Sequence, residues 1–240
     1  MENISYVGVS QLLSLQRQMD VTANNIANMS TPGFKTEGVL FIDQVNKAAS
    51  TPQEALTQAE NFGTYRDFSA GSLTPTYNDL DFAIQGEGYF TVQTPDGTRY
   101  TRDGSFSLND KGEIVTRSGA QLMGDGGPIV VPADAHKIHL NADGSIGTDK
   151  GPLGKVKIVS FEDEQKLKAL GGNLFDGGAA GEKPADKPHL EQGMIEASNV
   201  NPIVEMNKMI NILRAYESSQ RLMQNDHDRS LDMIQRLTRV

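Results

Sequence analysis

The sequence of 240 residues has no cysteine, no tryptophan and few aromatic residues, which make up 6% of the chain. Without cysteine it forms no disulfide, thiolate metal site or thiol nucleophile. It has no apolar run of the length that a transmembrane helix needs, so we expect no direct insertion into a membrane. Basic residues are also scarce, 22 against 31 acidic ones, for a net charge of −9. We therefore expect no nucleic-acid partner, because such proteins neutralise phosphates with a basic surface.

The N-terminal segment also lacks the features of a cleaved signal peptide. It has no cationic start, no uninterrupted apolar stretch behind it and no small-residue cleavage site. We expect any export of the chain to follow a route that does not cleave a signal peptide.

Histidines and acidic residues give no strong metal-site pattern. His136 and His139 are three residues apart in a predicted strand, where an odd spacing sends side chains to opposite faces. Residues 141–149 resemble a calcium-binding loop superficially, but their glycines miss the positions that such a loop requires. We expect a polar hairpin turn at this place, and no metal or cofactor.

Motifs of enzymes are missing as well. Gly86 and Gly88 begin a nucleotide-binding pattern, but a strand follows where that pattern needs a helix to receive a phosphate. Asp79 and Asp81 lie in a turn rich in Asn and Asp, a setting that explains acidic residues without catalysis. The sequence contains no nucleophile-elbow, zinc-protease or Walker motif. We expect that the protein is not an enzyme.

The N-terminal segment has the spacing of an amphipathic helix over residues 4–28. Side chains of its seam recur every three or four residues, as in a heptad repeat. Pro32 and Gly33 then end the helix, because proline disfavours helical geometry at the residue before it. Asparagines near this end either fray the helix or form packed hydrogen bonds at a helix contact. The seam consists of Leu12, Leu15, Met19, Thr22, Ile26 and Met29, and the candidate polar contacts are Asn24, Asn25 and Asn28.

The C-terminal segment predicts one long helix over residues 201–240. Asn201 suits the capping position and Pro202 the first turn, and no further glycine or proline interrupts the chain. The helix carries two apolar stripes, which is typical of a helix with more than one neighbour. One stripe consists of Ile203, Met206, Ile210 and Leu213, followed in the same phase by Leu231 and Ile234, and the other of Met209, Ile212, Tyr216 and Met223.

The middle of the chain predicts short strands joined by tight turns. Glycine-containing turn sequences recur along it, and between them apolar residues alternate with a period of two. Residues 173–188 are rich in Gly and Pro and are expected to be a loop or linker. The strands that we expect cover residues 89–93, 99–101, 114–116, 129–131, 137–140 and 156–161.

The terminal helices cannot satisfy all their apolar stripes within one chain. An isolated helix of this kind is marginal in water. Pairing the two helices would bury one seam and leave the second stripe of residues 203–234 exposed. We therefore expect the seam, the asparagines and both stripes to form an assembly interface between chains.

Several blocks of the sequence resemble the axial proteins of the bacterial flagellum, the rod and hook proteins. The resemblance spans nearly the whole chain, and its short length and ending, LRAYESSQRLM at residues 213–223, are similar to the proximal rod members. The other matching blocks are ANNIAN at 23–28, STPGFK at 30–35, GSLT at 71–74, LDFAIQGEGYF at 80–90, YTRDGSF at 100–106 and EASNVN at 196–201.

This resemblance implies a structural subunit of the flagellar basal-body rod. Terminal helices of many subunits would assemble into a hollow drive shaft that carries torque, with the β domain outside. The implied partners are copies of the chain, other proximal and distal rod subunits and the flagellar export apparatus, and the implied location is the periplasmic rod. The implied export requires no cleaved signal peptide.

The fold class that we predict is α+β, with long terminal helices in a coiled-coil-like assembly domain and a central irregular all-β domain of sandwich or barrel type. The expected boundaries are 1–34 and 199–240 for the helical domain, 35–80 for an extended connector and 81–198 for the β domain. Three alternatives remain open: a distal rod protein or other axial subunit, a dimeric β-sandwich binding module, and an enzyme with an unrecognised carboxylate site.

Overall fold

The computed structural model describes residues 2–44, 58–135, 137–178, 180–185 and 188–237. The chain divides into two compact units, and each is considered by itself. The helical unit comprises residues 1–27, 37–67 and 200–240, and the β unit comprises residues 28–36 and 68–199.

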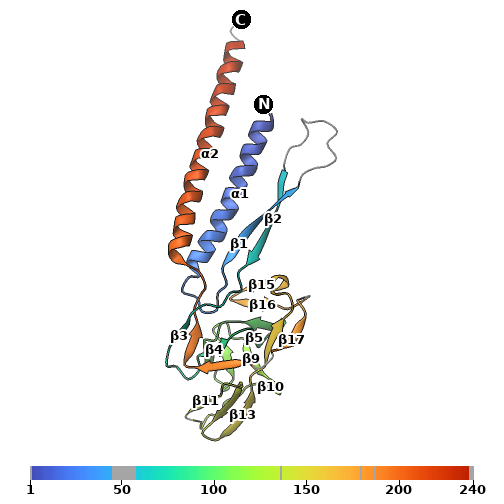
Figure 1. The fold of residues 1–240 in the computed structure, drawn as a ribbon, viewed down its shortest axis with the longest axis vertical. Helices are drawn as coiled ribbons and strands as arrows, with labels where there is room; N and C mark the ends of the chain where they lie inside the picture. The colour runs from blue at the N-terminus through green and yellow to red at the C-terminus, as the bar shows by residue number, and fades with distance from the viewer. Residues whose placement is uncertain (1, 45–57, 136, 179, 186–187, 238–240) are drawn as a thin grey trace. The chain divides into compact units, whose positions relative to one another are not determined.

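The helical unit consists of two helices and a β-hairpin. Helix α1 (Glu2–Ala27) and helix α2 (Pro202–Leu237) lie side by side and run antiparallel (Figure 1). Strands β1 (Glu37–Gln44) and β2 (Gln58–Arg66) pair antiparallel and contact α1. The cap predicted for α2 is confirmed, because the side-chain oxygen of Asn201 accepts hydrogen bonds from the backbone N–H groups of Ile203 and Val204.

The predicted coiled-coil-like assembly domain is wrong. The described residues contain no long coiled coil but a pair of helices of 26 and 36 residues, accompanied by the hairpin. The spacing of apolar residues fixes which face of a helix is buried, but not the length or identity of its partner. Here α1 uses one face for α2 and has the hairpin as a further neighbour. The α+β class with a central β region agrees with the structure.

The β unit contains short strands and one turn of 3₁₀ helix. Its elements are β3 (Leu73–Pro75), β4 (Phe82–Gln85), β5 (Tyr89–Thr94), β6 (Gly97–Thr101), β7 (Phe106–Leu108), β8 (Ile114–Thr116), β9 (Gln121–Gly124), β10 (Gly127–Pro128), β11 (Ile138–Leu140), β12 (Ser145–Thr148), β13 (Gly151–Lys155), β14 (Ile158–Phe161), η1 (Glu164–Lys166), β15 (Lys168–Gly171), β16 (Leu174–Asp176), β17 (Glu182–Pro184), β18 (His189–Gln192) and β19 (Met194–Glu196).

The largest sheet of this unit has the strand order β15-β16-β6-β5-β9-β8-β7, with β10 on β9, and β14 joining β5 to β17. Strands β11, β12 and β13 form a second sheet, while β18 pairs with β4 and β19 with β3. All these pairs are antiparallel, which suits the tight turns between neighbouring strands.

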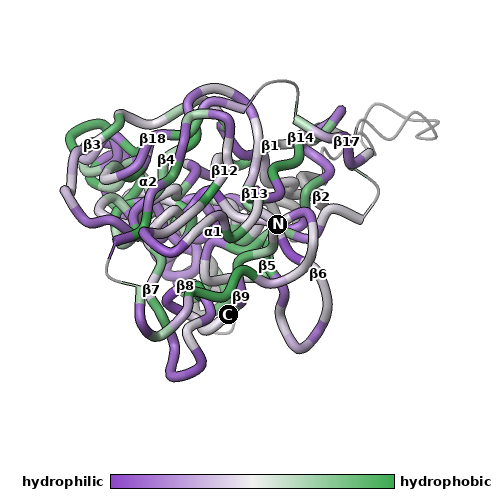
Figure 2. The backbone as a smooth tube through the Cα atoms, turned by 90° about the horizontal axis from the view of Figure 1, so that it is seen from below, coloured by the Kyte–Doolittle hydropathy of each residue, from purple (hydrophilic) through white to green (hydrophobic). Residues whose placement is uncertain are grey.

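Two hydrophobic clusters form the core of the β unit. The larger one joins residues of β4, β5, β7, β8, β9 and β11 with residues such as Ile146 and Val156, and the smaller one surrounds Tyr89, Tyr100 and Phe175. Seen along the tube, hydrophobic colour is concentrated in strands such as β5, β8 and β9, whereas many turns are polar (Figure 2). The core thus gathers strands that are far apart in the sequence.

Two expectations about the middle of the chain need correction. Residues 173–188 are not simply a loop or linker, because they contain β16 and β17, which pair with β15 and β14. Their Gly and Pro residues mark turns around short strands. Residues 129–131 do not form a strand, although Val130 forms an isolated bridge with Glu113.

The polar hairpin turn expected after β11 is confirmed, since Asn141 N–H donates to the Ser145 carbonyl over 2.9 Å.

The helical unit includes residues 37–67, which lie within the expected connector at 35–80. Part of that connector, residues 45–57, lies outside the described residues, as does His136. The domain boundaries proposed from the sequence stay a prediction.

Candidate assembly surface

Helix α2 presents two faces of opposite character within the helical unit. The face that contains Met209, Ile212, Tyr216 and Met223 is buried or half-buried. Antiparallel packing sets the contacts of this face: Gly8 of α1 lies so close to Met223 that a Cβ atom at Gly8 would overlap the Met223 sulfur. One of the two predicted stripes is therefore covered by α1.

The other predicted stripe of α2 remains on the surface of the chain. Ile203 is 72% exposed and Met206 56%, and Ile210 and Leu213 are 46% and 41% exposed. Leu231 and Ile234 near the end of the helix are exposed as well. The four side chains from Ile203 to Leu213 form an apolar row, and an exposed apolar patch of this kind marks a site of contact with another molecule.

Among the side chains that the structure describes, fewer large apolar ones are exposed on helix α1 than on α2. Leu12, Leu15, Met19 and Ile26 are half-buried within the unit, on the seam that the sequence predicts. Val9 and Leu13 are exposed on another side of the helix, with exposed fractions of 47% and 56%. Of the two helices, α2 thus carries more of the exposed apolar side chains that the structure describes.

Asn25 forms packed hydrogen bonds inside its own chain. Its side chain is almost fully buried, and its amide nitrogen donates to the carbonyl oxygen of Glu37 over 2.8 Å and to the Glu205 carboxylate over 3.1 Å. Its amide oxygen accepts from the N–H of Glu37 over 3.0 Å. Glu205 is also bonded by Lys208. One asparagine therefore joins α1, β1 and α2, which is the packed alternative that the sequence leaves open.

The predicted interface residues fall into two groups, and their role between chains stays a prediction. The structure buries or half-buries Leu12, Leu15, Met19, Asn25, Ile26, Asn28, Met209, Ile212, Tyr216 and Met223, and it exposes Asn24, Met29, Ile203, Met206, Ile210, Leu213, Leu231 and Ile234. Of these, Asn28 and Met29 belong to the β unit.

A buried ionic cluster in the β unit escaped the sequence analysis. Lys35 and Glu196 have side chains that are 1% and 2% exposed, and the Lys35 ammonium lies 2.6 Å from a Glu196 oxygen. The other Glu196 oxygen is 3.5 Å from the Arg102 guanidinium. Burial lowers the pKa of Lys35 below its ordinary value, although the Glu196 carboxylate acts in the opposite direction. No periodic pattern marks these residues, because their pairing is a long-range contact.

Arg102 connects this cluster to an aromatic group. Its guanidinium carbon lies 5.3 Å from the centre of the Tyr89 ring. The Tyr89 hydroxyl donates to Glu164 of η1 over 2.9 Å, and burial raises the pKa of Tyr89. The region thus contains two cations, Lys35 and Arg102, and two carboxylates. Glu196 pairs with both cations, and Glu164 accepts the hydroxyl of Tyr89.

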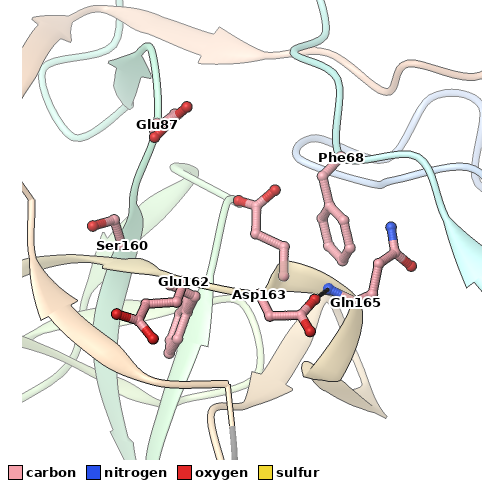
Figure 3. Close-up of a pocket in the computed structure, with 8 residues that line it drawn as sticks. Phe68, Glu87, Ser160, Glu162, Asp163 and Gln165 are labelled. Atoms are coloured by element: carbon pink, nitrogen blue, oxygen red, sulfur yellow. Dashed lines mark hydrogen bonds between the residues drawn. The ribbon is translucent and has the colours of Figure 1, made fainter.

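The β unit also has an acidic cleft of about 370 Å³ with two aromatic side chains in its wall (Figure 3). Three of its four carboxylates already have partners in the chain: Glu162 pairs with Lys183, Asp163 with Lys166, and Glu164 accepts the hydroxyl of Tyr89. These three carboxylates therefore interact with other groups of the chain. The lining residues are Phe68, Glu87, Ser160, Phe161, Glu162, Asp163, Glu164 and Gln165.

Within the part of the chain that the structure describes, no three or more His, Asp or Glu side chains gather as metal ligands. Neither α1 nor α2, over their described residues, has an apolar stretch long enough to cross a membrane. The surface feature that distinguishes this α+β protein is its apolar helix face.

Comparison with known protein families finds three matching models. Residues 6–35 match the model for the flagella basal body rod protein, and residues 83–148 match the D1 domain of the flagellar hook proteins FlgE/F/G. Residues 191–236 match the C-terminal model of the flagellar basal body rod FlgEFG proteins. The matches cover both helices and part of the β unit.

Whole-length relatives agree with these models. The chain is 36% identical over 244 residues to the flagellar basal-body rod protein FlgF of Caulobacter vibrioides, with 100% of both chains covered. It is 35% identical to FlgF of Mesorhizobium japonicum, covering 99% of this chain and 98% of the relative. It is 32% identical to FlgG of Bacillus subtilis, covering 90% and 92%. The chain belongs to the family of flagellar basal-body rod proteins.

Proposed function

We propose that this chain is a subunit of the proximal part of the flagellar rod and that it joins its neighbours through the outward apolar stripe of α2. The observation that carries this proposal is the contrast between the two stripes of that helix. One stripe is covered by α1, while Ile203, Met206, Ile210 and Leu213 remain exposed. A chain of this family thus has an apolar surface that needs a partner.

The apolar stripe is large enough to drive association. Complete burial of one such side chain contributes about 1.5–3 kcal/mol, so several of them together offset a substantial part of the entropy lost when subunits join. Partners of matching chemistry are other copies of this chain and other rod subunits. Contacts that connect a patch on one copy with a different patch on the next continue into a helical polymer.

Such a polymer would serve as a hollow shaft that transmits torque. To shear one helix past its neighbours, several apolar side chains must leave their packed positions together, and this resists twisting. We propose that the shaft lies in the periplasm and that the flagellar export apparatus delivers the chain without cleaving a signal peptide. The acidic β unit would form the outer, solvated part.

The proposed function is tested by removing the chain from cells and inspecting their basal bodies. We expect rods to be missing or truncated and swimming to stop, and the reintroduced chain to restore both. Complete rods and normal swimming without the chain would contradict the proposal.

The position along the rod is tested separately. In purified basal bodies we expect labelled copies of the chain at the motor end of the rod. The proposal rests here on two FlgF relatives that match over the full chain at 36% and 35% identity, whereas the FlgG relative of Bacillus subtilis matches at 32%. Label at the hook end would assign the chain to the distal rod.

A further inference from the structure

The chain passes between the helical unit and the β unit at four places, after residues 27, 36, 67 and 199. Three short segments of the β unit border these passages: 28–36, 68–71 and 196–199. Force carried along the chain passes from one unit to the other through these segments.

One carboxylate holds all three segments. An oxygen of Glu196 accepts hydrogen bonds from the Lys35 ammonium over 2.6 Å and from the N–H of Gly71 over 2.9 Å. Lys35 donates in addition to the carbonyl oxygen of Ser69 over 2.8 Å. Arg102 directly follows β6, and its guanidinium lies 3.5 Å from the second carboxylate oxygen of Glu196. We call Lys35, Glu196 and Arg102 the ion clamp.

Hydrogen bonds beside the ion clamp tie the same segments again. The side-chain oxygen of Asn199 accepts from the N–H of Thr36 over 2.8 Å and from its hydroxyl over 2.7 Å. The amide nitrogen of Asn199 donates to the carbonyl oxygen of Ser69 over 3.1 Å. The backbone N–H of Gly33 donates to the carbonyl oxygen of Glu196 over 2.8 Å. Several hydrogen bonds therefore join the three segments to one another at this place.

The ion clamp is not explained by a gain in folding free energy, because burying its charges is unfavourable. Buried ion pairs lose their hydration, and well-packed apolar side chains often do as well or better in their place. The buried Nε of Arg102 has no hydrogen-bond partner among the described residues, which adds to the cost. What ions do provide is a defined geometry, because each charge is stabilised only in contact with its partners.

We propose that the ion clamp positions the three segments so that load passes from the helical unit to the β unit without slippage. This inference rests on the proposed function in the rod, where the chain is under torque. Lys35, Glu196 and Arg102 are then positioning residues, and the loss of their charges should matter most when the rod works against a high load.

The test removes the two opposite charges together. Lys35→Met with Glu196→Gln keeps an unbranched side chain at Lys35, shorter by one heavy atom, keeps the length of the Glu196 side chain, and leaves an oxygen for the N–H of Gly71. The matched control, Lys183→Met with Glu162→Gln, makes the same changes in a pair whose side chains are each 59% exposed. If the double variant does not fold, Lys35→Met alone replaces it, because the Glu196 carboxylate then keeps the Arg102 guanidinium as its partner.

The first measurement uses the purified full-length chain. We expect amide hydrogens of residues 28–36 and 196–199, compared with those of β8 and β9 in the same unit, to exchange about tenfold faster in the clamp variant than in the control. The β unit of the clamp variant should also unfold at a lower temperature than the control, because Arg102 loses its carboxylate partner. Unchanged exchange in these segments would contradict the inference.

The second measurement uses cells that swim in media of rising viscosity. We expect cells with the clamp variant to assemble rods and to swim as the control does in thin medium, but to lose speed more steeply as viscosity rises. Equal speed of variant and control at every viscosity would overturn the inference while leaving the proposed function intact. Complete rods in cells without the chain would overturn the proposed function instead, and the two failures are thus distinguished.

Discussion

The side chains of Asn25 in α1 and Glu205 in α2 are joined by a hydrogen bond of 3.1 Å, although 180 residues separate them in the chain. The same asparagine binds both backbone groups of Glu37 in β1. A single buried amide therefore connects two helices and a strand and fixes their alignment at this place. Polar groups of this kind specify one arrangement because any shift leaves them without partners.

Replacing Asn25 should loosen the helical unit. In Asn25→Ala, the backbone groups of Glu37 and the buried carboxylate of Glu205 lose a partner, so we expect the free energy of unfolding of this unit to fall by about 2 kcal/mol or more. Urea denaturation followed by helical circular dichroism measures the change. The control is Asn211→Ala in the exposed part of α2, which should unfold at the same urea concentration as the unmodified chain or a higher one. Equal midpoints for Asn25→Ala and the unmodified chain would contradict this account.

Neighbouring residues of α2 should respond to a charge in opposite ways. Leu213 is 41% exposed, so Leu213→Asp should leave the monomer folded but prevent its incorporation into rods. Ile212 faces the inside of the unit, and Ile212→Asp should lower the free energy of unfolding of the helical unit by about 3 kcal/mol. Thermal unfolding and motility assays measure the two effects. Motile cells that carry only Leu213→Asp would show that the outward stripe is not an assembly contact, and the same result for Ile210→Asp would strengthen that conclusion.

Local features of the fold could be predicted from the sequence. The periodicity of α1 and α2, the cap at Asn201 and the turn signals between strands all depend on residues near one another in the chain. For the same reason, the spacing of residues in the sequence distinguishes the two apolar stripes of α2. The glycines and prolines in 173–188 predict a linker, yet they lie around β16 and β17 or at the end of β17, since turn residues mark the ends of short strands as well as loops.

The contacts between distant segments could not be predicted in the same way. Lys35 and Glu196 are 161 residues apart, and each is flanked by residues that give no sign of its partner. Heptad spacing in the terminal segments suggested a coiled coil, but a seam shows only that a face is buried. The partner of that face depends on the antiparallel packing of α1 and α2 and on the hairpin beside them.

Gly104 should tolerate no side chain. A Cβ atom at this position would overlap the carbonyl oxygen of Phe82, and the carbonyl of Gly104 accepts a hydrogen bond from Phe82 N–H over 2.9 Å. Because the overlap is with backbone, which cannot rotate away, Gly104→Ala should lower the free energy of unfolding of the β unit by about 3 kcal/mol. Gly126→Ala is the matched control, since no atom lies within 4 Å of its added Cβ. Thermal unfolding of both variants checks the difference, and equal melting temperatures would contradict it.

Two aspartates should give opposite dependences of stability on pH. Burial raises the pKa of Asp103 above its ordinary value of 3.8, so the folded state holds the proton more tightly than the unfolded state. The stability that this proton contributes is present below pH 3.8 and is lost as the pH rises through the folded pKa. Asp103→Asn should thus gain free energy of unfolding relative to the unmodified chain as the pH rises through this window.

Asp143 is the control of opposite sign. Hydrogen bonds from the hydroxyl and N–H of Ser145, of 2.7 and 3.0 Å, lower the pKa of its carboxyl. Its contribution to stability is present above the ordinary value of 3.8 and is lost as the pH falls through the folded pKa. Asp143→Asn should therefore be less stable than the unmodified chain at neutral pH, and the difference should shrink in acid. Denaturant titrations from about pH 3 to pH 8 measure both variants, and a common sign of the two slopes would show that burial does not control Asp103.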